Sequence, residues 1–346
     1  CANDSDGIAV AVPTGGTPPY TYLWNTTPPQ TDSIATGLYK SNAHKVTVTD
    51  SKGCFDVATG IIKEPPIMQL SINNQTNVLC NGDNNGSVSI KVTGGMPPYN
   101  YSWNTTPPAY TNNISGLYAG NYTLYVTDTN GCTKNISVNI TEPTPLNITM
   151  NKSDVTCYGY NNGSITAIVS GGTNPYRYYW NTTPIKYTST ITNLSPGDYN
   201  LTVIDTNNCI VSSSTTITQP PLLKSVINKT NVTCFGLNDA TLSVIPSGGT
   251  KPYTYLWSDM NTDSSRINVS AGNYYITITD SNGCYITDST TITQPDDISE
   301  THTINNCLCY NANTGRIRVT AEGGTPPYRY KWSNNSTNNI IKYLYA

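Results

Sequence analysis

The ten residues GGTPPYTYLW at positions 15–24 return four times in closely similar form, as GGMPPYNYSW, GGTNPYRYYW, GGTKPYTYLW and GGTPPYRYKW. The copies open at Gly15, Gly94, Gly171, Gly248 and Gly323 and close at Trp24, Trp103, Trp180, Trp257 and Trp332, with steps of 79, 77, 77 and 75 residues. A fixed period with small changes in loop length indicates tandem copies of one structural unit. The 346 residues therefore form a repeat array.

The quoted stretch has the period of a β-strand. Tyr20, Tyr22 and Trp24 lie on one face of such a strand, and Thr21 and Leu23 lie on the other. The copies keep the first face and vary the second, so we expect the first to be packed and the second to meet solvent. Neighbouring segments such as GSVSIKVT alternate in the same way, and no helical period is visible. We therefore predict an all-β chain of immunoglobulin-like or fibronectin-like β-sandwich repeats, each with its tryptophan as the core aromatic.

Proline-bearing stretches separate the copies: KEPP, TEPTP, TQPP and TQPDD. Proline favours extended, stiff connections, so these stretches are interpreted as short linkers. They place repeat 1 at residues 1–64, repeat 2 at 65–143, repeat 3 at 144–220, repeat 4 at 221–295 and a truncated repeat 5 at 296–346. Stiff linkers predict an extended rod.

A second motif opens a later strand of each complete repeat. The segments LYAGNY, LSPGDY and VSAGNY, which end at Tyr122, Tyr199 and Tyr274, resemble the tyrosine corner of immunoglobulin-like sandwiches. Repeat 1 has His44 in place of the tyrosine. We expect its corner to be looser.

Composition excludes several classes of function. Charged residues make up 11% of the chain and the net charge is −3, which gives no basic surface for nucleic acid. No apolar run approaches the roughly 20 residues that membrane insertion needs. The two histidines, His44 and His302, occupy positions that do not correspond, and no recurring carboxylate pair or phosphate-binding loop is found. We expect no catalytic residue, no metal, no cofactor and no enzyme activity.

One aspartate in each of the first four repeats precedes a tight turn. Asp50, Asp128, Asp205 and Asp280 stand in TDSKGC, TDTNGC, IDTNNC and TDSNGC. A calcium loop would need about 6–8 oxygen ligands, and each of these segments offers one carboxylate and one or two amides. A β-hairpin turn is the favoured interpretation.

The cysteines are regularly placed, which in a β protein of low charge indicates disulfides and an oxidising, extracellular setting. The disulfide candidates are Cys1, Cys80, Cys157, Cys234 and Cys309 before a strand, Cys54, Cys132, Cys209 and Cys284 after the hairpin turn, and the extra Cys307. Pairing within a repeat gives separations of 53, 52, 52 and 50 residues, and pairing across a repeat junction gives 26, 25, 25 and 25. Both are regular, so the spacing leaves the two pairings open. Either one predicts at most two free thiols.

The ordered set GGTPPYxYxW, AGNYTLYVTDTNGC and ITQP resembles the SprB-type repeats of Bacteroidota cell-surface adhesins over essentially the whole chain. The resemblance implies giant secreted proteins used for adhesion and, in some bacteria, for gliding motility. It brings no catalytic residues. We therefore expect a non-enzymatic, extracellular segment of a cell-surface adhesin or filament, acting as a disulfide-stabilised stalk with an adhesive surface. Its expected partners are neighbouring repeats of the same longer chain, together with surface polysaccharide or other cells.

A second function stays open, namely an array of carbohydrate-binding modules attached to a secreted enzyme. The excess of tyrosine, 26 against 2 phenylalanines, is compatible with exposed aromatic platforms. Exposure of Trp103 and Trp180 would favour this alternative, because the stalk interpretation buries both. Asn-x-Ser/Thr triplets at Asn25, Asn104 and Asn181 would make the chain a glycoprotein in a suitable host.

Overall fold

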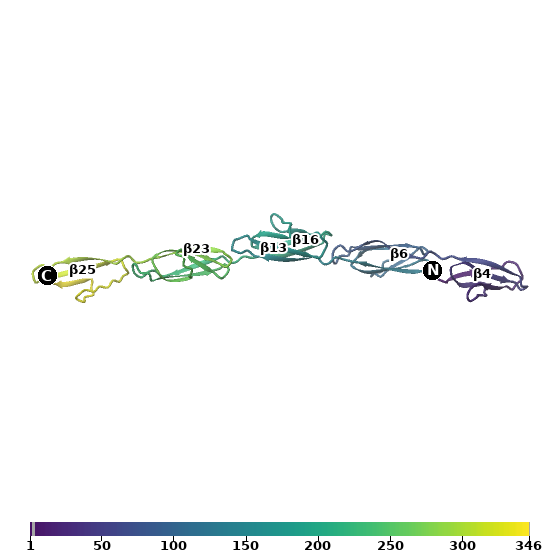
Figure 1. Ribbon diagram of the computed structural model, residues 1–346, viewed down its shortest axis with the longest axis horizontal. Coiled ribbons are helices and arrows are strands. Elements are labelled where there is room, and N and C mark those ends of the chain that lie inside the picture. Colours follow the sequence, from purple (N-terminus) through teal and green to yellow (C-terminus); the bar gives the residue numbers. More distant parts are fainter. Residues whose placement is uncertain (2–3, 346) are drawn as a thin grey trace. The chain divides into compact units, whose positions relative to one another are not determined.

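The computed structural model describes residue 1 and residues 4–345, and the described part contains β-strands and turns but no helix. Figure 1 shows the strands along the chain. The all-β prediction is therefore confirmed. By internal contacts the chain divides into two compact units, the first made of Cys1–Ile148, Val169–Tyr178 and Thr202–Ser212, and the second of Thr149–Ile168, Tyr179–Leu201 and Ser213–Ala346.

The strands follow the repeat period. Repeat 1 contains β1 (Gly7–Val10), β2 (Thr21–Trp24), β3 (Ile34–Leu38), β4 (Ser41–Thr49) and β5 (Phe55–Ile62). Repeat 2 contains β6 (Gln69–Thr76), β7 (Gly86–Thr93), β8 (Asn100–Trp103), β9 (Asn113–Leu117), β10 (Gly120–Thr127) and β11 (Thr133–Ile140). Repeat 3 contains β12 (Asn147–Ser153), β13 (Gly163–Ser170), β14 (Arg177–Trp180), β15 (Thr190–Leu194), β16 (Gly197–Ile204) and β17 (Ile210–Ile217).

The remaining strands belong to repeats 4 and 5. Repeat 4 contains β18 (Lys224–Lys229), β19 (Ala240–Ser247), β20 (Thr254–Trp257), β21 (Ser265–Val269), β22 (Gly272–Thr279) and β23 (Tyr285–Ile292). Repeat 5 contains β24 (Ser299–Asn305), β25 (Gly315–Glu322) and β26 (Ile340–Leu344).

Repeats 2, 3 and 4 each consist of two three-stranded sheets. In repeat 2 the sheet orders are β6-β7-β9 and β11-β10-β8, and the same arrangement recurs as β12-β13-β15 with β14-β16-β17 and as β18-β19-β21 with β20-β22-β23. Repeat 1 pairs only β1 with β3 beside the sheet β2-β4-β5, and repeat 5 has the single sheet β24-β25-β26. These two repeats therefore show part of the same sandwich.

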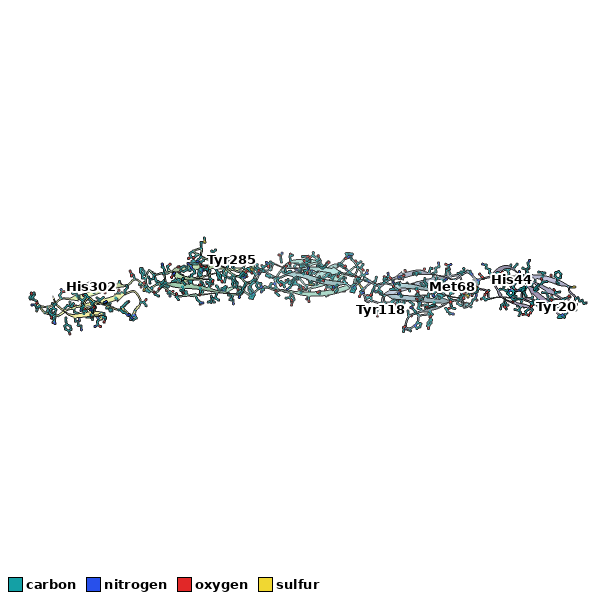
Figure 2. The ribbon with its side chains drawn as sticks, turned by 60° about the horizontal axis from the view of Figure 1, so that its bottom comes forward. Tyr20, His44, Met68, Tyr118, Tyr285 and His302 are labelled. Atoms are coloured by element: carbon teal, nitrogen blue, oxygen red, sulfur yellow. A yellow bond between two sulfur atoms is a disulfide. The ribbon has the colours of Figure 1, made fainter. Side chains whose placement is uncertain are left out.

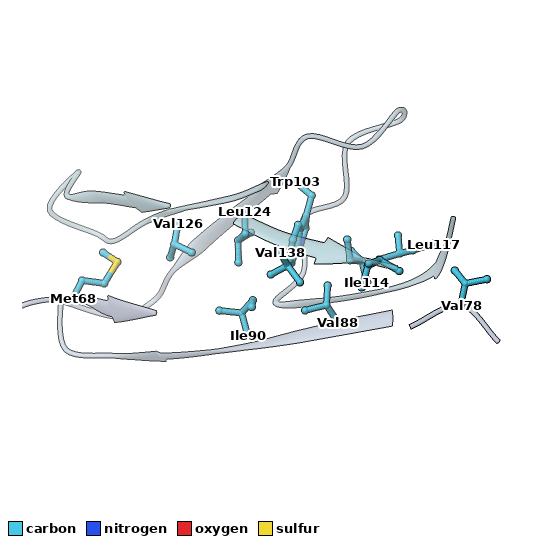
Figure 3. Close-up of a cluster of buried hydrophobic side chains, with 11 residues drawn as sticks. Met68, Val78, Val88, Ile90, Trp103, Ile114, Leu117, Leu124, Val126 and Val138 are labelled. Carbon is cyan, nitrogen blue, oxygen red and sulfur yellow. The ribbon is translucent and has the colours of Figure 1, made fainter. Parts of the chain in front are cut away.

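The core of repeat 2 lies between its two sheets. Figure 3 shows Trp103, Leu124 and Val126 facing Val88 and Ile90. The strand register explains this, since Leu124 lies opposite Trp103 in the antiparallel pair of β10 and β8. Residues two apart on a strand share a face, so Leu124 and Val126 both point inward.

The tryptophan of the repeated motif is buried wherever both sheets are present. Trp103, Trp180 and Trp257 are each 1% exposed. The indole Nε1–H of Trp103 donates to the carbonyl of Thr111 at 2.9 Å, so burial leaves this donor satisfied. Trp332 in repeat 5 is only partly buried, which corrects its assignment as a core residue, because the described residues of repeat 5 form the single sheet β24-β25-β26.

The tyrosine corner forms as its motif predicts. The Tyr122 hydroxyl donates to the Tyr118 carbonyl at 3.0 Å. The hydroxyls of Tyr199 and Tyr274 donate in the corresponding way to the carbonyls of Ser195 and Ser270. In repeat 1 His44, labelled in Figure 2, takes the place of the tyrosine. It is 4% exposed, and its Nε2 lies 2.8 Å from the carbonyl oxygen of Tyr39. The imidazole thus contacts an upstream carbonyl where the phenol does elsewhere, and a looser corner remains a prediction.

Candidate functional site

Two loops of repeats 2, 3 and 4, the return loop and the hairpin turn, form the candidate site; in repeat 1 Cys1 lies before the first strand β1. The return loop joins the first two strands of a repeat and carries its first cysteine, as in residues 77–85 of repeat 2. The hairpin turn joins the last two strands, as in residues 128–132. The return loop contacts the linker that leaves its repeat, and the hairpin turn contacts the double glycine that follows the incoming linker. The two loops therefore lie at opposite ends of a repeat.

Disulfides join the return loop of one repeat to the hairpin turn of the next. They are Cys1–Cys132, Cys80–Cys209 and Cys157–Cys284, with Cα–Cα distances of 5.4, 5.6 and 5.7 Å and sequence separations of 131, 129 and 127 residues. Both pairings considered from the sequence are therefore wrong. The two cysteines of one repeat are at opposite ends, and each end faces a neighbouring repeat.

Four thiols are free, which corrects the expectation of at most two. They are Cys54, Cys234, Cys307 and Cys309. In the register of the three observed disulfides, Cys54, Cys234 and Cys309 have no partner cysteine in the sequence. Cys307 is outside this register, and its Sγ lies 3.0 Å from the Leu344 carbonyl oxygen.

The hairpin turn is built around a buried aspartate. Asp205 is 0% exposed, and its carboxylate accepts from the backbone N–H groups of Thr173 at 2.8 Å and Cys209 at 2.9 Å. The same bonds recur at Asp50, Asp128 and Asp280. The carboxylate oxygens are therefore occupied by N–H donors, which agrees with a hairpin turn and leaves a calcium loop without support.

At Asp50 and Asp128 these hydrogen bonds lower the pKa of the carboxylate. At Asp50 the N–H groups of Thr17 and then Cys54 lower the pKa below the ordinary value. At Asp128, burial by itself would raise the pKa, but the N–H groups of Met96 and Cys132 outweigh burial and lower it. The Asp50 and Asp128 carboxylates are thus charged at neutral pH.

An asparagine of the hairpin turn binds the return loop of the preceding repeat. The Asn207 amide Nδ2 donates to the carbonyl of Leu79 at 3.0 Å, next to the disulfide of Cys80. Asn282 donates in the same way to the carbonyl of Thr156 at 3.0 Å, next to Cys157. The disulfides Cys80–Cys209 and Cys157–Cys284 are therefore each accompanied by a hydrogen bond between the same two loops.

The Glu or Gln side chain immediately before the linker proline accepts a hydrogen bond from the return loop of its own repeat. The backbone N–H of Gly82 donates to the Glu142 carboxylate at 2.6 Å, and that of Gly159 donates to the side-chain carbonyl of Gln219 at 2.7 Å. Gln294 accepts from the corresponding glycine of repeat 4. This role of the residue before the proline is not among the predictions made from the sequence. The signal was present, since every linker has Glu or Gln immediately before a proline.

The double glycine admits the incoming linker. A Cβ on Gly94 would lie 2.1 Å from the carbonyl oxygen of Ile67, and equivalent positions in repeats 3 to 5 are as close. The N–H of Gly95 donates to the Pro66 carbonyl at 2.6 Å. At Gly15 a Cβ would meet nothing within 4 Å, because no linker lies beside it in the described chain. The glycines are therefore needed for contact between linker and repeat.

The Asn-x-Ser/Thr triplets after the tryptophans have a structural use. The side-chain carbonyl of Asn104 accepts from the N–H of Thr123 at 2.8 Å, and Asn25 and Asn181 make the corresponding bonds. These amides hold the chain beside the core strand. A glycan on them remains a prediction.

Two further features, metal-binding clusters and membrane-spanning helices, concern the same described residues. Residue 1 and residues 4–345 contain no group of three or more His, Cys, Asp or Glu side chains placed to hold a metal ion. Nor does this part of the chain contain a helix long and apolar enough to cross a bilayer.

Comparison with known proteins identifies one family model, described as the SprB repeat, which matches residues 1–28, 72–107, 149–183, 226–262 and 301–337. No curated protein matches the chain. Among solved structures, an eight-immunoglobulin segment of Down syndrome cell adhesion molecule is 11% identical, with a TM-score of 0.28 over 95% of this chain and 63% of that one. A three-immunoglobulin segment of titin is 16% identical, with a TM-score of 0.33 over 67% of this chain and 99% of that one. A tetra-tandem repeat from the extending region of a large adhesion protein is 14% identical, with a TM-score of 0.27 over 79% and 91%.

Proposed function

Because the chain belongs to the SprB repeat family, we propose that it is a non-enzymatic, extracellular stalk segment of a cell-surface adhesin. The five repeats, bounded as in the sequence analysis, present an adhesive surface away from the cell. The observation that supports this most directly is the set of contacts at the junctions: an inter-repeat disulfide, an asparagine hydrogen bond and a linker pressed on a double glycine. Such contacts between consecutive repeats would not be needed if each repeat acted independently of its neighbours.

The stalk interpretation also accounts for the buried tryptophans. Carbohydrate-binding modules that stack sugars on tryptophan need the ring in solvent, whereas Trp103 and Trp180 are each 1% exposed. Their burial supports a scaffold role for the recurring motif.

Solution scattering on the oxidised chain tests this proposal. Each repeat should add roughly 35–40 Å, from strands that rise about 3.3 Å per residue together with turns and a linker. We expect a maximum dimension of roughly 160–180 Å from these spacings. A compact particle with a maximum dimension below about 90 Å would mean that the repeats fold onto one another, and the stalk proposal would fail.

An adhesive surface is proposed on the outer face of the sheet β20-β22-β23. Tyr275 and Tyr285 on this face are 60% and 67% exposed, and Leu256 beside them is 49% exposed. The register sets Thr277 opposite Thr287 between the two tyrosines. Exposed phenol rings beside hydroxyl groups suit an uncharged polysaccharide, because the rings stack on sugars while the hydroxyls exchange hydrogen bonds.

Binding of the chain to immobilised neutral polysaccharide tests this surface. The double variant Tyr275→Ala, Tyr285→Ala should lose at least tenfold in affinity. The matched control is Tyr110→Ala, which removes a ring that is 70% exposed away from this face. Equal binding by the double variant and the control would exclude the surface while leaving the stalk intact.

A further inference from the structure

The segment between each hairpin-turn cysteine and the next return-loop cysteine is almost entirely extended. From Cys132 to Cys157 it consists of strand β11, the linker and strand β12, and from Cys209 to Cys234 it consists of β17, the linker and β18. Both segments span 25 residues. We call each such segment a strut.

The inter-repeat disulfides join the struts end to end. One line begins at Cys1, crosses to Cys132, follows a strut to Cys157, crosses to Cys284 and continues along β23 and β24 to Cys309. The other line runs from Cys54 along β5 and β6 to Cys80, crosses to Cys209 and follows a strut to Cys234. The lines are offset by one repeat. In repeats 2, 3 and 4 the first strand therefore belongs to one line and the last strand to the other.

We propose that these lines carry tension along the chain: a pull on the two termini loads the line from Cys1 to Cys309, and the strands outside that line lie off the path of the load. Force between two points of a covalent network follows the shortest covalent connection once that connection is taut. A strand already rises about 3.3 Å per residue, and a fully stretched chain reaches at most about 3.6 Å, so a strut has little slack. Strands β7 to β10 of repeat 2 can then keep their core while the lines bear the load.

The connectivity fixes how far the chain can be stretched. Between residues 1 and 346 the shortest covalent path has 25 backbone steps from Cys132 to Cys157 and 62 from Cys284 to residue 346, together about 87. At about 3.4 Å per step this path is about 300 Å long. Without disulfides the same chain has 345 steps and stretches to about 1,200 Å.

Single-molecule stretching of the full chain, held at its two termini, tests the proposal. The oxidised chain should reach a contour length of about 300 Å, and dithiothreitol should raise it about fourfold. An oxidised chain that lengthens repeat by repeat to about 1,200 Å would overturn the proposal.

Two matched variants sharpen the test, because each removes one inter-repeat disulfide. Cys157→Ser with Cys284→Ser interrupts the line between the termini and leaves a shortest path of about 189 steps through Cys80–Cys209, so the contour length should rise about twofold. Cys80→Ser with Cys209→Ser leaves the path of about 87 steps intact, so the length should not change. Equal lengthening in both variants would contradict the load path. The comparison applies once each variant has formed its two remaining inter-repeat disulfides, since contour length at full extension depends on these covalent connections.

The biological use of the lines rests on the proposed stalk, but the stretching experiment does not. If scattering shows a rod but the oxidised chain stretches to about 1,200 Å, the load-bearing lines are refuted and the stalk is not. A compact particle with an inextensible chain would refute the stalk alone.

Discussion

At the scale of the residue, the tryptophan of the repeated motif and the aspartate of the hairpin turn stabilise the fold in different ways. Trp103 fills the space between two sheets and has its one polar group satisfied. Asp128 is 2% exposed and uses its carboxylate to hold the hairpin turn against the double-glycine corner. One residue supplies packing, and the other supplies backbone hydrogen bonds.

Trp103→Ala should lower the free energy of unfolding of repeat 2 by about 3–5 kcal/mol, because it removes a large buried ring and leaves a cavity. Hydrogen exchange with peptide resolution measures this repeat by itself. Tyr110→Ala is the control, since that ring is 70% exposed, and it should cost less than about 1 kcal/mol. Similar losses in the two variants would mean that the tryptophan is not a core residue.

The hairpin turns should weaken in acid. The pKa of Asp128 is lowered in the folded chain, so its carboxylate contributes stability that is complete above the pKa of an unfolded aspartate, near 3.9, and is lost as pH falls through the lower folded value. Protection of the 128–132 amides should therefore fall as the pH drops below about 4. Asp128→Asn should lose protection already at pH 7 and show a shallower decline. A variant that keeps the pH profile of the unaltered chain would disprove this role.

At the scale of the element, the double glycine is a joint between linker and repeat. Gly94 and Gly15 occupy the same place in successive repeats, with φ of 70° and 86°. They differ in surroundings, since only Gly94 has a linker carbonyl against it.

Gly94→Ala should therefore destabilise its repeat more than Gly15→Ala. Both variants place an alanine in the left-handed region, which costs roughly 1–2 kcal/mol. Only Gly94→Ala also forces a Cβ to within 2.1 Å of a backbone oxygen, so the linker must move. Thermal unfolding of the two variants gives the comparison. Equal losses would show that conformation alone, without the linker contact, requires the glycine.

Strand period, core face and tyrosine corner could be predicted because each depends on residues close in sequence. Tyr101 and Trp103 lie two residues apart on β8 and Tyr99 comes just before that strand, so the alternation alone assigns all three to one face. The substitute corner at His44 could not be predicted, since an imidazole reaches a carbonyl only if the backbone around it adjusts, and here the register shifts between Ser41 and His44.

At the scale of the whole molecule, the repeats are joined through loops that are far apart in sequence. Cys80 and Cys209 are 129 residues apart, and their pairing depends on which end of a repeat each loop occupies. Regular spacing supported two other pairings equally, because a periodic chain has several regular ways to pair its cysteines. The cysteines of the candidate site could therefore be predicted from the sequence. Which cysteine pairs with which could not, because the pairing depends on the direction in which each strand runs.

The inter-repeat disulfide is the central claim, and non-reducing peptide mapping by mass spectrometry tests it most directly. The oxidised chain, digested with its free thiols blocked, should yield one linked peptide pair containing Cys80 and Cys209 and another containing Cys157 and Cys284. Cys54 and Cys234 should carry the blocking group. A linked pair of Cys80 with Cys132, or of Cys132 with Cys157, would show pairing within a repeat or across one linker and would contradict the account.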